Sequence, residues 1–333
     1  MIIVAADGSG DYRTVQEAID AADAYGSAEP VTIRVRSGIY KEKVTVGRPG
    51  ITLVGDHAES TIITYDDYAR KRFPDGEHYH TFNSYSFLVA ADDFTAEQLT
   101  FANTAGPGER VGQALAVYAD GDRTIFRRCR FLGAQDTLFT GPLPPQPKER
   151  ASFGGPRDSL PRRDTRQYYE DCYLEGDIDF IFGSAAAYFY RCELFSRRRE
   201  PQWKEEGAGL PVIQGWITAA STPEHALYGY VFDNCRLTGD APAGSVYLGR
   251  PWRDHAHTVF KNCWMGAHIK PEGWDNWGRP HCEHLVRYEE YGSTGPGASP
   301  LQRVSWSRQL LPEEAERYTA AHVLAGHDGW YPR

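Results

Sequence analysis

Asp179 is the residue of this sequence whose surroundings point most directly to chemistry. It lies within the apolar run 178–182, and Gly176 and Gly183 lie on either side of that run. A short apolar run between glycines is typical of a buried strand. A carboxylate in such a strand is costly to bury unless a partner compensates its charge. Asp179 is therefore a candidate for catalysis, with a structural aspartate in a turn as the alternative.

Three other short motifs contain polar residues of the kinds that such a carboxylate needs. Gln113 lies in an apolar segment, and Gln135 lies beside Asp136 at the end of a predicted strand. Arg250 and Trp252 are separated by a single proline. If these segments belong to successive coils of one repetitive structure, their side chains can meet on one face although they are distant in sequence.

Two carboxyl groups, a guanidinium and amide donors together favour acyl transfer. Two neighbouring carboxyl groups do not both ionise freely, so one stays protonated while the other is charged. The charged one can attack an ester carbonyl, and the protonated one can give its proton to the leaving alcohol. Glutamine amides can donate hydrogen bonds to the oxyanion, and losing one such donor lowers the rate by roughly 10²–10³.

The elements that must position these residues are short. The spacing of Thr14 and Glu17 predicts a capping box, followed by one amphipathic helix over about residues 14–25. After this helix, β-branched and apolar runs alternate with Gly, Asp and Asn, which predicts short strands joined by turns. The predicted early strands are 31–35, 44–46, 51–54, 61–64 and 87–89.

A loose repeat begins near residue 94 and recurs at intervals of about 20 to 43 residues. Each unit has a polar residue, a small residue, a variable residue and a large apolar residue. Such irregular repetition predicts a solenoid whose stacked coils share one core, with the N-terminal helix capping its open end. The small position is a cysteine in five units, namely Cys129, Cys172, Cys192, Cys235 and Cys263.

These cysteines are interpreted as a ladder of small buried side chains. Thiols are expected, although neighbouring coils could bring Cys172 and Cys192 close enough for a disulfide. A zinc site is disfavoured because the sequence has no Cys-x-x-Cys pair.

Bulk composition excludes several classes of partner. Acidic residues outnumber basic ones by 45 to 36, and the net charge of −9 argues against nucleic acid. No apolar run approaches the roughly 18 residues of a membrane helix, so no membrane partner is expected. Residues 1–7 show no secretory signal. We therefore expect a cytoplasmic monomer, with a secreted or periplasmic protein as the alternative if the N-terminus has been trimmed.

We predict a single domain over residues 1–333, interrupted by an inserted loop at 141–166. This loop is rich in proline and arginine and lacks the alternation of a strand. Its length suggests a functional rim or lid rather than a domain boundary.

These motifs, in this order, resemble those of pectin methylesterases, a family of carbohydrate esterases. The similarity begins at 7–19, continues through 38–42 and 101–106, and ends near 269–274, so it covers nearly the whole chain. It implies an all-β, right-handed parallel β-helix with an N-terminal capping helix. It implies no metal and no organic cofactor. The inserted loop is longer than in plant-type members of the family.

The resemblance also implies roles for individual residues. Asp179 would be the nucleophile, Asp136 the general acid and then base, and Gln135 the oxyanion donor, with Gln113 and Arg250 completing the catalytic set. The residues that match substrate-contacting positions are Thr81, Gln113, Phe182, Arg250 and Trp252. The expected reaction hydrolyses the C6 methyl ester of galacturonate units in pectin (homogalacturonan) or its oligomers and releases methanol.

Two other classes of function stay open at this point. A glycoside hydrolase or lyase acting on pectin would also use a β-helix and carboxylates, although the paired glutamines favour an ester carbonyl. A solenoid that only binds would be expected to lack one of Asp136, Asp179 and Arg250, and all three are present. Trp216 and Trp277, like Trp274, are assigned to core or rim without preference.

Overall fold

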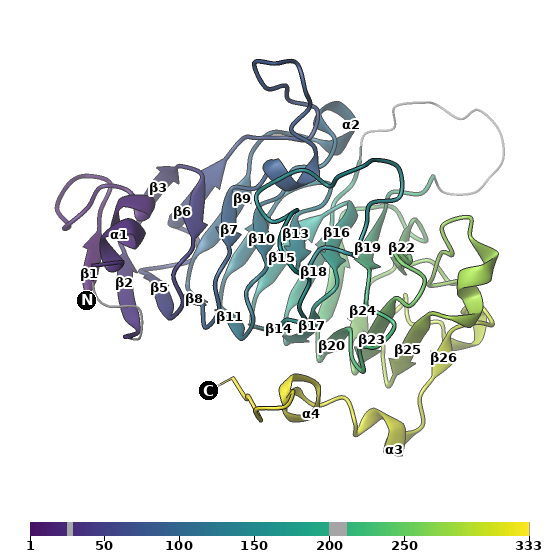
Figure 1. The fold of residues 1–333 in the computed structure, drawn as a ribbon. Coiled ribbons are helices and arrows are strands. Elements are labelled where there is room, and N and C mark those ends of the chain that lie inside the picture. The colour runs from purple at the N-terminus through teal and green to yellow at the C-terminus, as the bar shows by residue number, and fades with distance from the viewer. Residues whose placement is uncertain (25–28, 200–211, 333) are drawn as a thin grey trace.

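The computed structural model describes residues 1–24, 29–199 and 212–332. The chain winds into an elongated coil of short strands (Figure 1). Its strands form three sheets, and neighbouring strands within each sheet pair in parallel. The predicted all-β parallel β-helix is confirmed, and the early strands begin at the predicted residues.

The first sheet contains β1 (Ile2–Val4), β2 (Val31–Val35), β5 (Ile51–Gly55), β8 (Thr95–Glu97), β11 (Thr124–Arg127), β14 (Arg166–Glu170), β17 (Ala186–Tyr190), β20 (Tyr230–Asp233), β23 (His257–Lys261), β25 (Arg287–Tyr291) and β26 (Arg308–Gln309). The second sheet contains β4 (Val44–Val46), β7 (Phe87–Val89), β10 (Val117–Ala119), β13 (Leu138–Thr140), β16 (Ile178–Gly183), β19 (Gly215–Ala220) and β22 (Val246–Gly249). The third sheet contains β3 (Gly38–Lys41), β6 (Thr61–Tyr65), β9 (Thr100–Asn103), β12 (Arg130–Leu132), β15 (Tyr173–Gly176), β18 (Glu193–Ser196), β21 (Arg236–Gly239) and β24 (Trp264–Met265).

Helix α1 (Val15–Ala22) covers the N-terminal end of the coil (Figure 1). The capping box is present, because the Thr14 hydroxyl accepts from the Glu17 N–H and the Glu17 carboxylate accepts from the Thr14 N–H. The apolar face of the helix belongs to the main core. The helix ends at Ala22, earlier than predicted, since periodicity alone does not fix a helix end; residue 25 lies outside the described residues.

The polar residue at the first position of each repeat forms a corner of the coil. The residue there lies between a strand of the first sheet and a strand of the third, and its φ is between 51° and 55° in every unit (Gln98, Arg128, Asp171, Arg191, Asn234 and Asn262). This left-handed conformation makes the corner of the coil. Asn and Asp adopt it more readily than most residues, and a β-branched residue there would be strained.

Side chains at equivalent positions of successive coils stack into ladders that fill the interior. The five cysteines of the repeat are buried and free, which confirms the predicted ladder of small side chains. An aromatic ladder lies on the adjoining strands, with ring centroids of successive members 4.4–5.2 Å apart (Phe126, Tyr169, Phe189, Phe232 and Phe260). Stacked coils thus bury the same face repeatedly, which gives the strands of the site a rigid base.

The C-terminal segment returns along the outside of the first sheet (Figure 1). It contains α3 (Pro312–Ala315) and α4 (Ala320–Leu324), whereas the short helices η2 (Pro280–His284) and η3 (Pro300–Gln302) precede β25 and β26. Val323 and Leu324 pack in a cluster with Tyr188 of β17. The Asp328 carboxylate pairs with Arg166 of β14, which fastens the end of the chain to the coil. Within the described residues, the longest apolar helices fall well short of a membrane span.

Candidate active site

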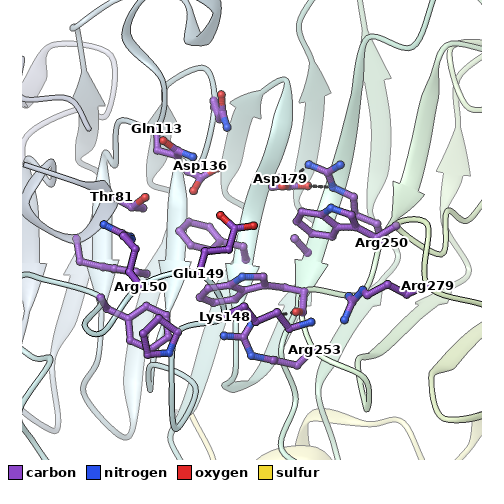
Figure 2. A pocket seen from close by; sticks show the side chains of 18 residues that line it. Thr81, Gln113, Asp136, Lys148, Glu149, Arg150, Asp179, Arg250, Arg253 and Arg279 are labelled. Carbon is purple, nitrogen blue, oxygen red and sulfur yellow. Dashed lines mark hydrogen bonds and ion pairs between the residues drawn. The ribbon is translucent and has the colours of Figure 1, made fainter. Parts of the chain in front are cut away.

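An open groove of about 420 Å³ lies on the second sheet (Figure 2). Strands β16 and β19 and the turn that leads into β13 provide its floor, and the connection from β13 to β14 provides one wall. The structure brings all the sequence-predicted site residues together in this groove. They are Thr81, Gln113, Gln135, Asp136, Asp179, Phe182, Arg250 and Trp252.

The Asp179 carboxylate forms a bidentate ion pair with the Arg250 guanidinium. Arg250 Nε donates to Oδ1 at 2.8 Å and Nη2 donates to Oδ2 at 2.7 Å. Asp179 lies in β16 and Arg250 follows β22, two strands away in the second sheet. Paired, charge-assisted hydrogen bonds of this kind fix the orientation of a carboxylate as well as its charge. The buried Asp179 therefore has the partner that the sequence required.

The two aspartates occupy matching positions on adjacent coils. Leu138 of β13 pairs with Ile181 of β16, and each aspartate precedes its paired residue by two positions. Both aspartates have left-handed backbones, with φ of 62° at Asp136 and 51° at Asp179. Aspartate adopts this conformation more readily than most residues, and it also recurs at the corners of the coil.

The surroundings of the two carboxyl groups give them different protonation states. Burial raises the pKa of Asp136 well above its ordinary value, and the charge of Asp179 raises it further. Burial also raises the pKa of Asp179, but the Arg250 guanidinium opposes this effect at close range. The directions of these pKa shifts favour a protonated Asp136 beside an ionised Asp179.

The two glutamines come from the segments that lead into neighbouring strands, β10 and β13. The backbone carbonyl of Gln135 accepts from Ala114, which ties the two segments together at 3.2 Å. Helix α2 (Gly108–Val111) covers Gln135 so closely that a Cβ added at Gly108 would lie 2.8 Å from the Gln135 Cβ. Any larger residue at position 108 would therefore displace the Gln135 side chain, whose amide faces the groove.

Aromatic rings line the part of the groove beside the carboxyl groups. Phe82, the middle residue of the short 3-10 helix η1 (Thr81–Asn83), packs within a cluster that includes Phe139, Phe153 and Phe182. Trp252 packs against Phe182 with ring centroids 5.6 Å apart. This surface is apolar and rigid, and it is suited to the carbon-rich face of a sugar.

Sequence reasoning missed the way in which Arg250 is held. Its guanidinium lies between two indole rings, 3.8 Å from the centroid of Trp216 and 3.7 Å from that of Trp277. Asp275 supports both tryptophans, because it accepts from the Trp216 indole N–H at 2.8 Å and from the Trp277 backbone N–H at 2.7 Å. Trp274, by contrast, is buried in the core. No spacing in the sequence signals this sandwich, because its two faces come from β19 and from a loop.

One group of described side chains has the composition of a metal site, namely Asp254, His281 and Cys282. Asp254 already accepts a hydrogen bond from the Arg279 guanidinium at 2.7 Å. The Cys282 thiol lies 3.2 Å from the same carboxylate oxygen. A cation that competes with Arg279 for this oxygen would meet a positive charge, so we assign the group to an ion pair with hydrogen bonds.

Comparisons with known proteins agree on one family. The family model described as Pectinesterase matches residues 1–142 and 148–327. Pectinesterase 31 of Arabidopsis thaliana is 36% identical over 329 residues, which cover 96% of this chain and 90% of that protein. Pectinesterase 2 of Citrus sinensis is 32% identical, and the match covers 99% of this chain and 58% of that longer protein.

Solved structures give the same result. Pectin methylesterase from carrot is 32% identical with a TM-score of 0.78, covering 98% of this chain and 93% of that one. A pectin methylesterase in complex with a hexasaccharide is 28% identical with a TM-score of 0.79, covering 99% of this chain and 98% of that one. The likeness thus extends along the full coil and includes the strands of the groove.

Proposed function

The chain belongs to the pectinesterase family, whose members are carboxylic ester hydrolases, and we propose that it removes C6 methyl esters from galacturonate units of pectin or its oligomers and releases methanol. One observation supports this most strongly. A carboxylate held by a guanidinium faces the same open groove as a second carboxyl group whose pKa is raised by burial, with two amide side chains beside them. This set of groups is suited to acyl transfer.

In the proposed first step, a carboxylate oxygen of Asp179 attacks the ester carbonyl. Each oxygen of Asp179 accepts one bond from Arg250 and retains a lone pair for the attack. The negative charge passes to the carbonyl oxygen, where the amide N–H groups of Gln113 and Gln135 stabilise it. The C–OCH₃ bond then breaks, and Asp136 gives its proton to the leaving oxygen, so methanol departs.

In the second step, water hydrolyses the acyl-enzyme. Asp136, now ionised, takes a proton from the attacking water. The bond between Asp179 and the galacturonyl carbon breaks, which returns Asp179 to its carboxylate form beside Arg250. Asp136 is protonated again, and the product is a galacturonate unit with a free carboxyl group.

Pectin is also the partner that the shape of the groove favours. The relative with a bound hexasaccharide shows that this fold can hold a chain of several sugars. In this protein, Trp252 and Phe182 present apolar rings next to the carboxyl pair. We infer that these rings pack against the sugar units and place one ester over Asp179.

The proposed function is tested by measuring methanol and polymer length together. Methylated pectin and short methylated oligogalacturonides are incubated with the protein side by side. We expect methanol from both substrates while the chain lengths stay constant. Shortened chains without methanol would indicate cleavage of the glycosidic bond. Binding without either product would indicate a protein that only binds the polymer.

The indole sandwich around Arg250 leads to a first prediction about a single residue. Trp277→Ala removes one face of the sandwich, and a cation–π contact contributes about 0.5–2 kcal/mol. We therefore expect kcat for methanol release to fall by roughly 2- to 30-fold, because Arg250 then holds Asp179 less firmly. Trp277→Phe keeps an aromatic face and should restore most of the loss.

Trp264 provides a matched control for this experiment. It is exposed to a similar extent and contacts the Arg236 guanidinium, at 5.2 Å, on the third sheet outside the groove. Trp264→Ala should leave kcat unchanged. An equal loss of kcat in the two alanine variants, or no loss in Trp277→Ala, would show that the indole sandwich does not contribute to catalysis.

A further inference from the structure

A cluster of three charged side chains lies next to the groove, although none of the three lines it. Arg199 Nε lies 3.1 Å from a carboxylate oxygen of Glu109 and 3.6 Å from one of Asp177. The two acidic side chains are only 8% and 5% exposed, so one guanidinium balances two carboxylates with little help from water. Removing one partner from such a group leaves a buried charge without compensation, which is costly. The ion pairs therefore hold the three side chains in place.

Glu109 connects this cluster to the oxyanion donor. It belongs to helix α2, and a Cβ added at the preceding Gly108 would lie 3.0 Å from the Gln135 amide oxygen. A helix of four residues has little stability of its own, so α2 depends on contacts outside itself. Arg70 donates to the Glu109 carbonyl at 3.1 Å, and Arg199 holds the Glu109 carboxylate. Loss of either contact would let α2 shift and take the Gln135 amide with it.

Asp177 connects the cluster to the second carboxyl group and to the indole sandwich. It lies directly before β16, and its backbone N–H donates to the Ala134 carbonyl at 3.0 Å. The carbonyl of the next residue, Ile178, accepts from the Asp136 N–H, also at 3.0 Å. The Asp177 carbonyl accepts from the backbone N–H of Trp216 at 3.1 Å. Hydrogen bonds thus join three successive coils of the groove at Asp177.

Arg199 is itself held by the coil that follows. It lies after β18, and its backbone N–H donates to the side-chain oxygen of the buried Gln214 at 2.7 Å. Gln214 directly precedes β19, a floor strand of the groove. The Arg199 side chain therefore joins α2 to the start of β16 from a fixed position on the coil.

We propose that Arg199 is a positioning residue for the proposed reaction and acts through its two carboxylate partners. It keeps the Gln135 amide and the Asp136 carboxyl group in the geometry that the reaction needs. This rests on the proposed function, because it concerns the same groove. The amide stabilises an oxyanion that exists only near the transition state, so the contribution of Arg199 should be to kcat rather than to KM.

The experiment compares Arg199→Gln and Arg199→Lys with the wild type on a methylated oligogalacturonide. A misplaced catalytic group costs up to about 10²-fold in rate. We expect Arg199→Gln to lower kcat for methanol release about tenfold while KM stays within about twofold. Arg199→Lys keeps a positive charge between the carboxylates and should restore kcat to within about threefold of the wild type. A raised KM with kcat retained, or a lysine variant no better than the glutamine variant, would overturn the proposal.

Arg127→Gln is the matched control for loss of a guanidinium between two carboxylates. Arg127 lies in β11 on the first sheet, 3.0 Å from Glu170 and 3.9 Å from Glu97, and its side chain is 15% exposed. The thermal stability of this variant should fall while kcat is retained. Equal losses of kcat in Arg127→Gln and Arg199→Gln would show that Arg199 only stabilises the fold.

A second readout does not depend on methanol. Burial raises the pKa of Asp177 to about 6, so this carboxylate is charged at neutral pH. Burial and Asp179 raise the pKa of Asp136, and the charge of Asp177 adds to their effect. We therefore expect the pKa of Asp136, measured by carbon-13 NMR, to fall in Asp177→Asn.

This measurement separates failure of the inference from failure of the proposed function. An unchanged or raised pKa of Asp136 in Asp177→Asn would overturn the link between the cluster and the carboxyl group, even if the wild type released methanol. If the wild type released no methanol, the proposed function would fail, whereas a lowered pKa of Asp136 would still support that link.

Discussion

Asp179→Asn is expected to lower kcat for methanol release by roughly 10⁴–10⁶-fold, the range seen when a nucleophile is removed. Asparagine has the same shape, so the groove keeps its form, but an amide has neither the charge nor the nucleophilicity of a carboxylate. Binding of a methylated oligomer should persist, because the aromatic rings and the other polar groups of the groove remain. Methanol release and calorimetry on the same preparation measure the two effects.

Loss of folding must be separated from loss of chemistry in this variant. Removing the Asp179 charge leaves the Arg250 guanidinium, whose side chain is 14% exposed, without its ion-pair partner. Breaking a fully buried pair in this way destabilises proteins by about 3–5 kcal/mol, which is an upper bound here. Asp233→Asn is a suitable control, because Asp233 is also buried and pairs with Lys261 at 3.3 Å on the first sheet. Its thermal stability should fall while kcat is retained. Substantial esterase activity in folded Asp179→Asn would show that another residue is the nucleophile.

Asp136→Asn is expected to lower kcat by roughly 10²–10⁴-fold, the usual contribution of a general acid. Asparagine accepts the left-handed backbone at this position, with φ of 62°, so the variant should fold. The loss should shrink when methanol is replaced by a more acidic leaving alcohol, because such an alcohol departs without a proton. Kinetics on methyl and trifluoroethyl esters of the same oligomer test this directly.

The same variant should change the pH profile in a defined way. In the wild type, we expect activity to fall at low pH as Asp179 becomes protonated, and to fall at high pH as Asp136 loses the proton that its raised pKa lets it hold. Asparagine at position 136 has no such proton, so the alkaline limb should disappear while the acidic limb stays. An alkaline limb that persists in Asp136→Asn would assign the acid to a different group.

The sequence was sufficient to predict the coil and the residues that gather in its groove. Asp136 and Asp179 occupy matching positions of adjacent coils. The sequence predicted that they meet through the interpretation of stacked coils and through the resemblance to pectin methylesterases. The sequence shows a polar residue at the start of each repeat. The reason for it, a corner of the coil with a left-handed backbone, is seen only in the structure. The catalytic roles of the groove residues stay predictions.

The features that escaped sequence reasoning come from segments that do not repeat. Trp277 and Asp275 lie in a loop after β24, and only the path of this loop in space brings them to Arg250. Lys148 belongs to the inserted connection between β13 and β14, which is held by contacts from separate parts of the chain, such as the bonds from Arg253 to the Gln146 carbonyl and from Arg157 to Asp120. Periodicity gives no information about such loops, because their conformation depends on contacts made elsewhere in the fold.

The most direct test of the central claim is the protonation state of the two carboxyl groups in the folded protein. Carbon-13 NMR of protein labelled at the aspartate carboxyl carbons, with Asp136→Asn and Asp179→Asn used for assignment, follows each group as pH is raised. We predict that Asp179 ionises first and that Asp136 still holds its proton at pH values where the protein releases methanol. Ionised Asp136 beside protonated Asp179, or two ionised groups throughout that range, would contradict the account.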